Sequence, residues 1–451
     1  MSTRTITESD LNEGQSNAIQ AMVDFVQSDD QFFLLEGAAG TGKSTCIQFF
    51  CQILPKLLDR PVKIALTAPT NKAAGVLRRM QREIGGHSEV RTIYSLLGLR
   101  LKNDEPVRDV GASGENDAEK FNIIVVDEGG MVSRTQADET GRTKSGLMDY
   151  LRGAAIEYGC KFIIMADRYQ WNPIGQGLSP VFDIERGCRL TEVVRHDNQI
   201  LKFCTHIRTL IDANCRLTTY TTDCDENGGV YVMNARSFQE KMRQGFTSDA
   251  YSERPDSFRT IAWRNATVIG YNEMVRTAMY GEEVAEKSPF VVGERIIACQ
   301  PIQPVTKSDD DLEFYMTTDQ EGEVIGTKEV YHPIYRSLKT NCLTIEPDEG
   351  PTVTAYTIHK ESERDYKALA DKMSNAAKER KQSWAEYWTL KEKIHDIRPC
   401  HALTSHRAQG STFETVFVDV PDLMANINTW EAMRGLYVAC SRPSRILILK
   451  K

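Results

Sequence analysis

The sequence lacks any apolar run long enough to cross a bilayer. Runs such as Phe162–Ala166 are far shorter than the about 20 residues that a transmembrane helix needs. The first residues, Met1–Glu8, also lack the apolar centre of a secretory signal. We therefore expect a cytoplasmic protein without a membrane-spanning segment.

An excess of positive charge is also missing. The 55 lysines and arginines are outnumbered by 63 aspartates and glutamates, and the net charge is −8. A protein that coats nucleic acid is usually basic overall. Any nucleic-acid binding by this chain must therefore use a local groove.

Paired cysteines of the Cys-x-x-Cys type do not occur among the eleven cysteines. Several stand alone in apolar surroundings, for example Cys46, Cys160 and Cys440. This pattern argues against zinc ribbons and against a disulfide scaffold. It favours free thiols in a reducing compartment.

The 451 residues allow two to four domains, and the first part of the chain predicts an α/β fold. Short apolar runs alternate there with helical segments, and each run ends at glycines or polar residues. The runs are Phe32–Glu36, Ile64–Ala68, Ile123–Asp127 and Phe162–Ala166. This alternation is typical of a parallel sheet that binds its ligand at the carboxyl ends of the strands.

A second alternating region begins near residue 191. Its predicted strands are Thr260–Trp263, Thr415–Val420 and Arg445–Leu449. No repeat of solenoid period is present. We therefore expect a second α/β domain after the first.

Two segments interrupt these regions. Residues 99–121 are polar and turn-rich, with no aromatic residue between Leu99 and Phe121, and predict either a hairpin or a loop without regular structure. Residues 291–399 predict short strands followed by a helical stretch over 360–396. A capping box, Ser383-x-x-Glu386, indicates that this stretch divides into two helices.

The segment Gly37–Thr45, Gly-Ala-Ala-Gly-Thr-Gly-Lys-Ser-Thr, follows the first predicted strand and opens a helix. It matches the P-loop pattern, and it lies between a predicted strand and a predicted helix, as a P-loop does. Backbone N–H groups and the helix N-terminus favour phosphate there. Lys43 is expected to reach the β- and γ-phosphates, and Ser44 to hold Mg²⁺.

Two further strand ends carry candidate catalytic groups. Asp127 and Glu128 follow the third strand, so Asp127 can bind Mg²⁺ and Glu128 can polarise the attacking water. Asp167 and Gln170 follow the fourth strand and can sense the γ-phosphate. The first part is therefore predicted to be a nucleotide-dependent motor, and a surface role for Asp167 and Gln170 remains open.

With its later motifs, the chain resembles superfamily 1 helicases of the 5′→3′ branch (superfamily 1B), most closely the Dda-type helicases of T-even phages and more distantly RecD-like enzymes. The resemblance covers nearly the whole chain in order. The matching segments are Leu11–Gln15 (Q motif), Gly37–Thr45 (I), Thr67–Ala74 (Ia), Arg91–Leu97 (Ib), Asp127–Glu128 (II), Ala166–Gly175 (III), Leu190–Arg195, Thr404–Gly410 (V) and Leu436–Arg442 (VI).

This resemblance implies the roles of further residues. Arg195 and Arg442 would contact the γ-phosphate as arginine fingers, and Gln15 would read adenine. ATP would be bound by Gln15, Gly37, Ala38, Ala39, Gly40, Thr41, Gly42, Lys43, Ser44, Thr45 and Gly410, and Mg²⁺ by Ser44 and Asp127. DNA would be bound by Pro69, Thr70, Lys72, Thr92, Thr404 and His406, although an ordinary structural role for His406 stays equally open.

The resemblance also implies an architecture of two RecA-like P-loop motor domains with insertions. The first motor domain would comprise 1–98 and 122–190 with a pin at 99–121, the wedge that splits the duplex. The second would comprise 191–290 and 400–451, with an SH3-like module and helical tower at 291–399. Trp384, Tyr387 and Trp388 share one helix face there, which either packs inside the helical hairpin or docks onto the pin.

The chain departs from the family pattern at several motif positions. Gly129 and Gly130 stand where relatives carry a small residue and a serine, so a hydroxyl is lost beside motif II. Motif III begins with Ala166 and continues Trp171-Asn172, and motif Ia has Asn71 in place of histidine. The P-loop lysine, both carboxylates, Gln170 and both arginines remain, which predicts an active ATPase with altered coupling.

Three functions are compatible with these residues. The first is an ATP-dependent 5′→3′ DNA helicase, working as a monomer on single-stranded and forked duplex DNA in the host cytoplasm, with single-strand-binding or replication and recombination proteins as candidate partners. The second is a single-strand translocase that displaces proteins but unwinds weakly. The third is a nucleotide-gated DNA-binding accessory protein.

Overall fold

The computed structural model describes residues 6–58, 61–102, 105–108, 115–137, 143–173, 175–192, 199–226, 228–303, 305, 316–381 and 383–451. The chain divides into two compact units. The first comprises Met1–Phe238, Ile261–Trp263 and Ala408–Lys451, and the second comprises Gln239–Thr260 and Arg264–Arg407. Among the described residues, no helix is both long and apolar enough to cross a membrane.

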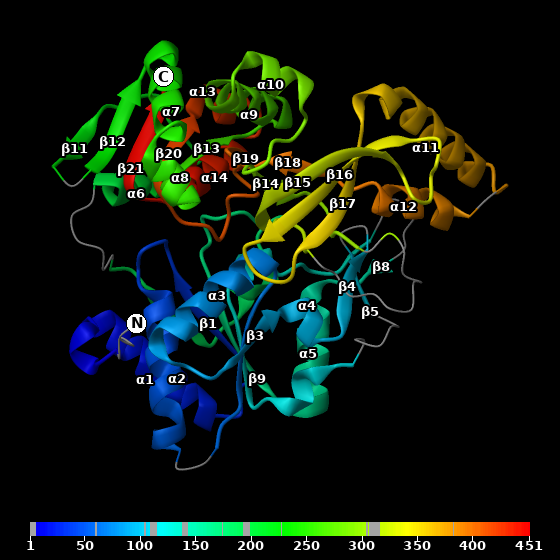
Figure 1. Ribbon diagram of the computed structural model, residues 1–451. Helices are drawn as coiled ribbons and strands as arrows, with labels where there is room; N and C mark the ends of the chain where they lie inside the picture. Colours follow the sequence, from blue (N-terminus) through cyan, green and yellow to red (C-terminus); the bar gives the residue numbers. More distant parts are fainter. Residues whose placement is uncertain are drawn as a thin grey trace. The chain divides into compact units, whose positions relative to one another are not determined.

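The first unit contains a six-stranded parallel sheet with the order β10-β1-β9-β6-β2-β3. Figure 1 labels β1, β9 and β3 of this sheet. Its strands are β10 (Gly187–Leu190), β1 (Phe32–Gly37), β9 (Lys161–Ala166), β6 (Ile123–Val126), β2 (Ile64–Ala68) and β3 (Glu89–Thr92). The four strands predicted for the first part of the chain are therefore confirmed. The two edge strands, β10 and β3, were not predicted because they are short and partly polar.

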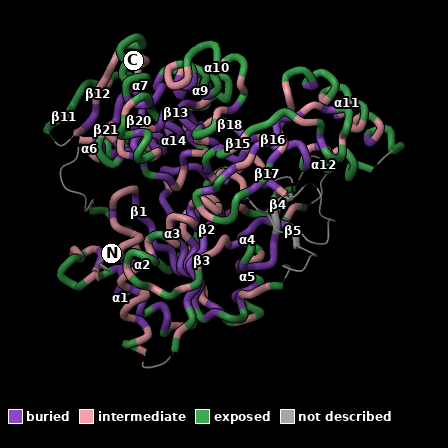
Figure 2. Tube along the Cα trace, viewed as in Figure 1, coloured by how far each residue is buried: buried purple, intermediate pink, exposed green. Residues whose placement is uncertain are grey.

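Helices cover both faces of this sheet, which explains why its central strands, such as β6 and most of β9, are apolar on both faces. Side chains at odd positions of β9, such as Ile163 and Met165, pack in one core with α1 (Glu13–Gln27), α2 (Lys43–Leu57) and α3 (Asn71–Ile84). Even positions, such as Phe162 and Ile164, pack with α4 (Ile93–Leu96) and α5 (Leu147–Tyr158). The central strands β2, β6 and β9 are mostly buried, and Figure 2 shows the middle of this sheet in purple; the edge strands β3 and β10 are mostly intermediate or exposed.

A second sheet has the order β11-β12-β21-β20-β13-β19, and the boundary between the two units passes through β13. Its strands are β11 (Asp223–Asp225), β12 (Gly228–Met233), β21 (Pro443–Lys450), β20 (Phe413–Asp419), β13 (Phe258–Ala262) and β19 (Ala402–Thr404). Strands β12, β21 and β20 are parallel. The helices of this region are α6 (Gln199–Asp212), α7 (Ala235–Phe246), α13 (Val420–Met424) and α14 (Thr429–Cys440). A second α/β region is thus confirmed.

The second unit contains a five-stranded antiparallel sheet with the order β17-β16-β15-β14-β18. The strands are β14 (Arg295–Ala298), β15 (Glu321–Tyr331), β16 (Lys339–Pro347), β17 (Val353–Ile358) and β18 (Ile397–Pro399). Its helices are α8 (Asp249–Glu253), α9 (Asn265–Tyr280), α10 (Glu282–Lys287), α11 (Glu363–Lys378) and α12 (Trp384–Lys393). The segment 291–399 thus holds the predicted strands and helix pair, whereas its SH3-like character stays a prediction.

Helix α12 begins where the capping residue predicted it. The Ser383 hydroxyl accepts a hydrogen bond from the Ala385 N–H at 3.2 Å, which satisfies a donor at the helix start. Tyr387 packs against the small core formed by Leu338, Ala370, Leu390 and Ile394. Trp384 and Trp388 are each 42% exposed, so packing within the hairpin accounts for only one of the three aromatic residues.

Within 99–121, the structure contains an antiparallel hairpin of β4 (Leu99–Lys102) and β5 (Glu105–Arg108). The hairpin interpretation of this segment therefore holds for its first part, while residues 103–104 and 109–114 lie outside the described residues. A second short ribbon, β7 (Gln136–Ala137) and β8 (Thr143–Lys144), was not predicted. The proposed domain limits stay predictions.

Acid should destabilise the second unit through its buried histidines. The Nδ1 of His395 accepts the Tyr356 N–H at 2.9 Å, and burial lowers the pKa of His395 to about 4. An unfolded histidine has a pKa of about 6.5, so the unfolded chain binds the proton first as pH falls. The contribution of His395 to the free energy of unfolding is therefore fully present above pH 6.5. It falls as the pH is lowered toward 4, by about 3 kcal/mol in total.

The variant His395→Asn tests this expectation because its amide oxygen can still accept the Tyr356 N–H. Hydrogen exchange of the β17 amides at pH 7 and pH 4.5 should show a smaller acid effect than in the parent chain. The exposed His87→Asn is the matched control and should behave like the parent. Equal acid sensitivity of the His395 variant and the parent would contradict the prediction.

Candidate nucleotide site

The predicted motifs lie along one edge of the first sheet. Strands β1, β9, β6 and β2 are consecutive neighbours and parallel. The P-loop, the Asp167–Gln170 loop, the Asp127–Glu128 pair and the Pro69–Lys72 turn follow these strands in that order. Because parallel strands end on the same side, the sheet brings these four segments together.

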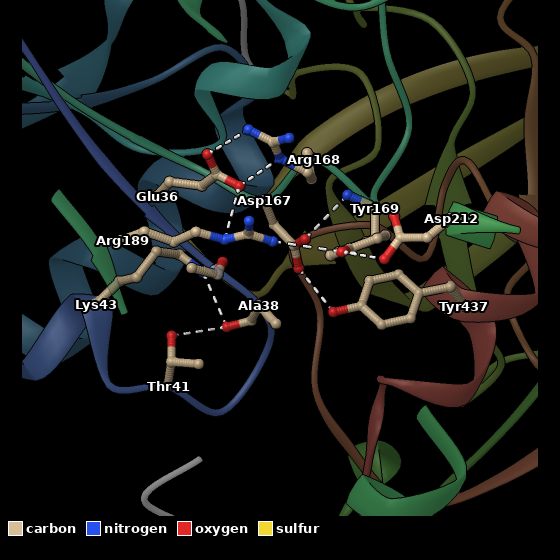
Figure 3. A network of polar contacts seen from close by, with 11 residues as sticks. Glu36, Ala38, Thr41, Lys43, Asp167, Arg168, Tyr169, Arg189, Asp212 and Tyr437 are labelled. Atoms are coloured by element: carbon tan, nitrogen blue, oxygen red, sulfur yellow. Dashed lines mark hydrogen bonds and ion pairs between the residues drawn. The ribbon is translucent and has the colours of Figure 1, made fainter. Parts of the chain in front are cut away.

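The P-loop is built by two glycines in left-handed conformation, Gly40 (φ 83°) and Gly42 (φ 81°), and Gly42 is the N-cap of α2. The Lys43 ammonium donates to the carbonyls of Gly37 at 2.5 Å and Ala38 at 3.2 Å. The Thr41 hydroxyl also donates to the Ala38 carbonyl, at 2.9 Å (Figure 3). The lysine thus lies over the loop, at the end of a helix whose N–H groups favour an anion.

Gln15 links the first helix to the P-loop. Its side-chain oxygen accepts the Asn12 N–H at 3.0 Å, which closes a capping box at the start of α1. Its side-chain N–H₂ donates to the Thr41 carbonyl at 3.4 Å, and the residue is buried. Adenine recognition by Gln15 stays a prediction.

The two carboxylates after β6 differ in environment. The Asp127 side chain accepts the Glu128 N–H at 2.8 Å, yet desolvation and the neighbouring Glu128 charge raise the pKa of Asp127 to about 7. Glu128 has the left-handed φ of 50°, which is uncommon for a residue with a side chain. Its carboxylate accepts a hydrogen bond from Gln409 at 3.2 Å, so a motif V side chain contacts the predicted base.

The residues predicted to hold Mg²⁺ fit that ion chemically. Ser44 lies at the start of α2 and Asp127 at the end of β6, so a hydroxyl and a carboxylate face the same sheet edge. Mg²⁺ in nucleotide sites is commonly held by one or two such oxygens together with phosphate. A cation would also relieve the repulsion between Asp127 and Glu128 that raises the Asp127 pKa.

The first glycine after motif II, Gly129, has a structural explanation. A side chain at Gly129 would place its Cβ 2.2 Å from Ile164 Cγ2, so the close approach to β9 requires glycine. The Ser179 hydroxyl donates to the Val132 carbonyl at 2.7 Å and lies 3.3 Å from the Gly129 carbonyl. A hydroxyl therefore reaches this turn from Ser179, although the sequence lacks the motif II serine.

The Asp167–Gln170 loop is held from two sides. Arg168 donates to the Glu36 carboxylate at the end of β1, and Arg189 lies 3.3 Å from the same carboxylate (Figure 3). From the other side, the Tyr437 hydroxyl of α14 donates to Asp167 at 2.8 Å. Glu36, Arg189 and Tyr437 were not among the predicted site residues, although Glu36 directly precedes the P-loop and Tyr437 lies within motif VI.

Gln170 is buried, and its side-chain oxygen has no hydrogen-bond partner among the described residues. A buried acceptor is costly to leave unpaired, and such groups in native sites usually meet a ligand or water. A cavity of about 100 Å³ lies beside the loop, lined by Glu36, Ala38, Asp167, Arg189 and Arg208 among others.

The two predicted arginine fingers have different outcomes. Arg195 lies outside the described residues. The Arg442 guanidinium is buried and donates to the carbonyls of Val438 and Ser411 and to the Ser441 hydroxyl. All of these partners belong to residues 411–441, so the γ-phosphate contact of Arg442 stays a prediction.

The end of motif V, Ala408–Gly410, packs against motif Ia within the first unit. Gly410 has a φ of 77°, and a Cβ there would lie 3.5 Å from Ala73 Cβ on α3. The Lys72 ammonium lies 5.8 Å from the centre of the Phe413 ring. This part of the predicted ATP and DNA site is therefore assembled from segments more than 300 residues apart in the chain.

The predicted DNA-binding hydroxyls serve as helix caps. Thr70 accepts the Ala73 N–H at 3.2 Å at the start of α3, and Thr92 accepts the Ser95 N–H at 3.1 Å at the start of α4. Pro69, beside Thr70, is buried. The roles of these residues in DNA binding stay predictions.

Thr404 and His406 belong to the second unit. Thr404 is buried at the end of β19, and His406 is exposed two residues later. A cavity of about 360 Å³ lies next to Thr404, lined in part by Asn265, Asn272 and Arg407. Of the predicted DNA contacts, Pro69, Thr70, Lys72 and Thr92 therefore lie in the first unit, whereas Thr404 and His406 lie in the second.

The chain is similar to known proteins over nearly its whole length. Residues 10–210 match the family model described as AAA domain, and residues 399–449 match the UvrD-like helicase C-terminal domain. The "ATP-dependent DNA helicase dda" of Enterobacteria phage T4 is 24% identical, over 97% of this chain and 98% of that protein. An uncharacterized protein, R530, of Acanthamoeba polyphaga mimivirus is 23% identical, over 97% of this chain and 99% of that protein.

A solved structure of two coordinating Pif1 helicases, which concerns DNA unwinding at forked double-stranded DNA, is similar in fold. It has a TM-score of 0.52 at 15% identity and covers 97% of this chain and 92% of that chain.

Fold and site together define a P-loop nucleotide-binding protein with RecA-like α/β motor domains. Among such proteins, the predicted resemblance to superfamily 1B DNA helicases of the Dda type is confirmed over nearly the full length of the chain.

Proposed function

We propose that the chain is an ATP-dependent 5′→3′ DNA helicase that moves along single-stranded DNA and unwinds duplex. One observation carries the proposal: the P-loop, the Asp127–Glu128 pair and the Gln170 loop follow three neighbouring parallel strands, in a chain similar to Dda from end to end. ATP hydrolysis and helicase activity are the functions that this combination supports best.

In this proposal each motor residue has a defined task. Lys43 and the P-loop N–H groups bind the β- and γ-phosphates, and Ser44 and Asp127 hold Mg²⁺, which neutralises phosphate charge when bound. Glu128 accepts a proton from the attacking water. Gln170 positions the γ-phosphate, and Arg195 and Arg442 stabilise the charge that develops on it.

Single-stranded DNA would be bound by its phosphates and by the faces of its bases. Pro69, Thr70, Lys72 and Thr92 in the first unit, and Thr404 and His406 in the second, are the proposed contacts. Hydroxyl and backbone groups suit phosphate without reading sequence. Single strands and forked duplexes are the proposed substrates, and a monomer acting in the host cytoplasm remains part of the proposal.

The deciding experiment compares duplexes that carry a 5′ or a 3′ single-stranded tail. With ATP and Mg²⁺, the chain should separate the 5′-tailed duplex and leave the 3′-tailed duplex paired. Unwinding of the 3′-tailed substrate alone would refute the polarity. DNA-stimulated phosphate release without unwinding of either would indicate a translocase, and no phosphate release would indicate a DNA-binding accessory protein.

The exposed aromatic face of α12 is proposed to support strand separation. The β4–β5 hairpin would serve as the pin, and the resemblance implies that the helical insertion braces it. Because Trp384 and Trp388 are each 42% exposed, their replacement costs little core packing. We expect Trp384→Ala with Trp388→Ala to lower unwinding per ATP by about tenfold, with DNA-stimulated ATPase within about twofold of the parent.

The measurement pairs forked-duplex unwinding with ATPase on the same preparation. Substitution is preferable to deleting residues 360–396, because the His395 N–H donates to the Tyr356 carbonyl at 2.8 Å and deletion would open β17. Ile325→Ala, 43% exposed on β15, is the matched control and should leave both activities unchanged. If the tryptophan variant unwinds as well per ATP as the parent, the face is not a brace.

A further inference from the structure

One face of α14 contacts both the P-loop and the Asp167–Gln170 loop through side chains that have no role assigned so far. The Tyr437 hydroxyl accepts the Ala39 N–H of the P-loop at 3.1 Å and donates to the Asp167 carboxylate at 2.8 Å. One buried oxygen atom therefore connects two loops that follow neighbouring strands, β1 and β9. Figure 3 shows Tyr437 directed at Asp167.

Arg434 lies one helical turn before Tyr437 and contacts the same loop. Its guanidinium donates to the carbonyls of Arg168 and Gln170, the latter at 2.8 Å. The group lies 4.1 Å from the centre of the Trp430 ring, which fixes its plane. Its Nε is buried without a partner among the described residues, and burial lowers the pKa of Arg434 to about 10.

Such costly burial needs compensation. A buried guanidinium and a buried hydroxyl are stabilised only when their hydrogen bonds are satisfied in good geometry. Here the hydrogen bonds run to the two loops of the nucleotide site, and two of the acceptors are main-chain carbonyls of one loop, those of Arg168 and Gln170. The contacts therefore fix loop position rather than the chemistry of any single side chain.

We propose that Tyr437 and Arg434 form a latch on α14 that positions the Asp167–Gln170 loop against the P-loop, and thereby holds Gln170 in place for ATP hydrolysis. The inference rests on the proposed ATPase function. Neither residue touches nucleotide in this scheme, so both are positioning residues. Gln170 contributes to the reaction only when the latch holds its loop in place.

The first test is Tyr437→Phe, which removes one oxygen and keeps the ring that packs edge-on against Tyr169. We expect kcat for DNA-stimulated ATP hydrolysis to fall about tenfold, because hydrogen bonds to charged groups are typically worth that much. KM for ATP should change by less than about twofold, since the phosphate-binding groups of the P-loop remain. Arg434→Lys, which keeps the charge but loses the planar fork, should act in the same direction.

A second readout separates positioning from general stability. Hydrogen exchange of the peptides that cover Ala39 and residues 161–172 should become faster in Tyr437→Phe, while peptides of the second unit are unchanged. Tyr251→Phe is the matched control, because its buried hydroxyl bonds His401 at 2.7 Å within the second unit. That control should leave kcat and the exchange of both loops as in the parent.

The outcomes distinguish the latch from the proposed function. A parent chain that shows no DNA-stimulated ATPase would refute the function itself. If the parent hydrolyses ATP and Tyr437→Phe matches it in kcat and in loop exchange, the latch is refuted and the function stands. A fall of kcat with unchanged hydrogen exchange of the loops would also refute the latch. So would a fall of kcat no larger than the one that Tyr251→Phe causes.

Discussion

Replacing Lys43 by alanine is expected to lower DNA-stimulated ATP hydrolysis by about 10²–10³-fold or more. The Lys43 ammonium lies over the P-loop, bonded to the Gly37 and Ala38 carbonyls, at the start of α2. It is the P-loop cation that the motif aims at the β- and γ-phosphates. Loss of one preorganised positive group at transferring phosphate has an effect of this size. Phosphate release with and without single-stranded DNA measures it.

The control for this prediction is Lys56→Ala, an exposed lysine in the last turn of the same helix. It should hydrolyse ATP like the parent. Binding of single-stranded DNA by Lys43→Ala should persist, because the proposed DNA contacts lie on other segments. Turnover of Lys43→Ala within a few-fold of the parent would refute the P-loop assignment, whatever the DNA affinity shows.

The central strands of the first sheet could be predicted because each is a continuous apolar run. Burial on both faces leaves Ile123–Val126 without polar positions, and the same holds for most of β9. The edge strand β3 (Glu-Val-Arg-Thr) and the strand β11 (Asp-Cys-Asp) carry polar side chains instead. Nothing in their composition distinguishes them from loops, so sequence patterns alone could not find them.

The motifs located the loops that the structure brings to one edge of the sheet, but not how these loops are joined. Lys43, Asp127 and Gln170 could be located because their roles depend on short local patterns after strands. The bonds of Tyr437 to Ala39 and of Arg434 to Gln170 join residues nearly 400 and more than 260 positions apart. Such contacts depend on how the helix packs, which no local spacing encodes.

The glycines that follow motif II also show that a local sequence pattern does not reveal packing with distant residues. The sequence suggested that Gly129 and Gly130 weaken coupling because a hydroxyl is missing. In the structure, Ile164 leaves no room for a side chain at Gly129, and Ser179 supplies a hydroxyl to the turn from 50 residues away. A Cβ at Gly130 would meet no atom closer than 3.7 Å, so packing explains the glycine at position 129 and not the one at position 130. A motif comparison reveals neither the close approach of Ile164 nor the hydroxyl of Ser179.

Replacing Glu128 by glutamine is expected to lower the rate of ATP hydrolysis by about 10²–10⁴-fold while ATP binding is retained. An amide cannot accept the proton of the attacking water, and general-base catalysis is worth this much. The replacement is nearly isosteric, and its side-chain oxygen can still accept the hydrogen bond that Gln409 donates to Glu128. The left-handed backbone at φ 50° is as accessible to glutamine as to glutamate.

Binding and chemistry are measured separately in this test. Equilibrium binding of a fluorescent ATP analogue should give a Kd within about threefold of the parent, and single-turnover hydrolysis should be slow. Glu157→Gln, an exposed glutamate on α5, is the matched control and should bind and hydrolyse normally. If Glu128→Gln loses nucleotide binding together with turnover, the residue maintains the site rather than acting as its base, because a lost proton acceptor alone leaves the P-loop contacts intact.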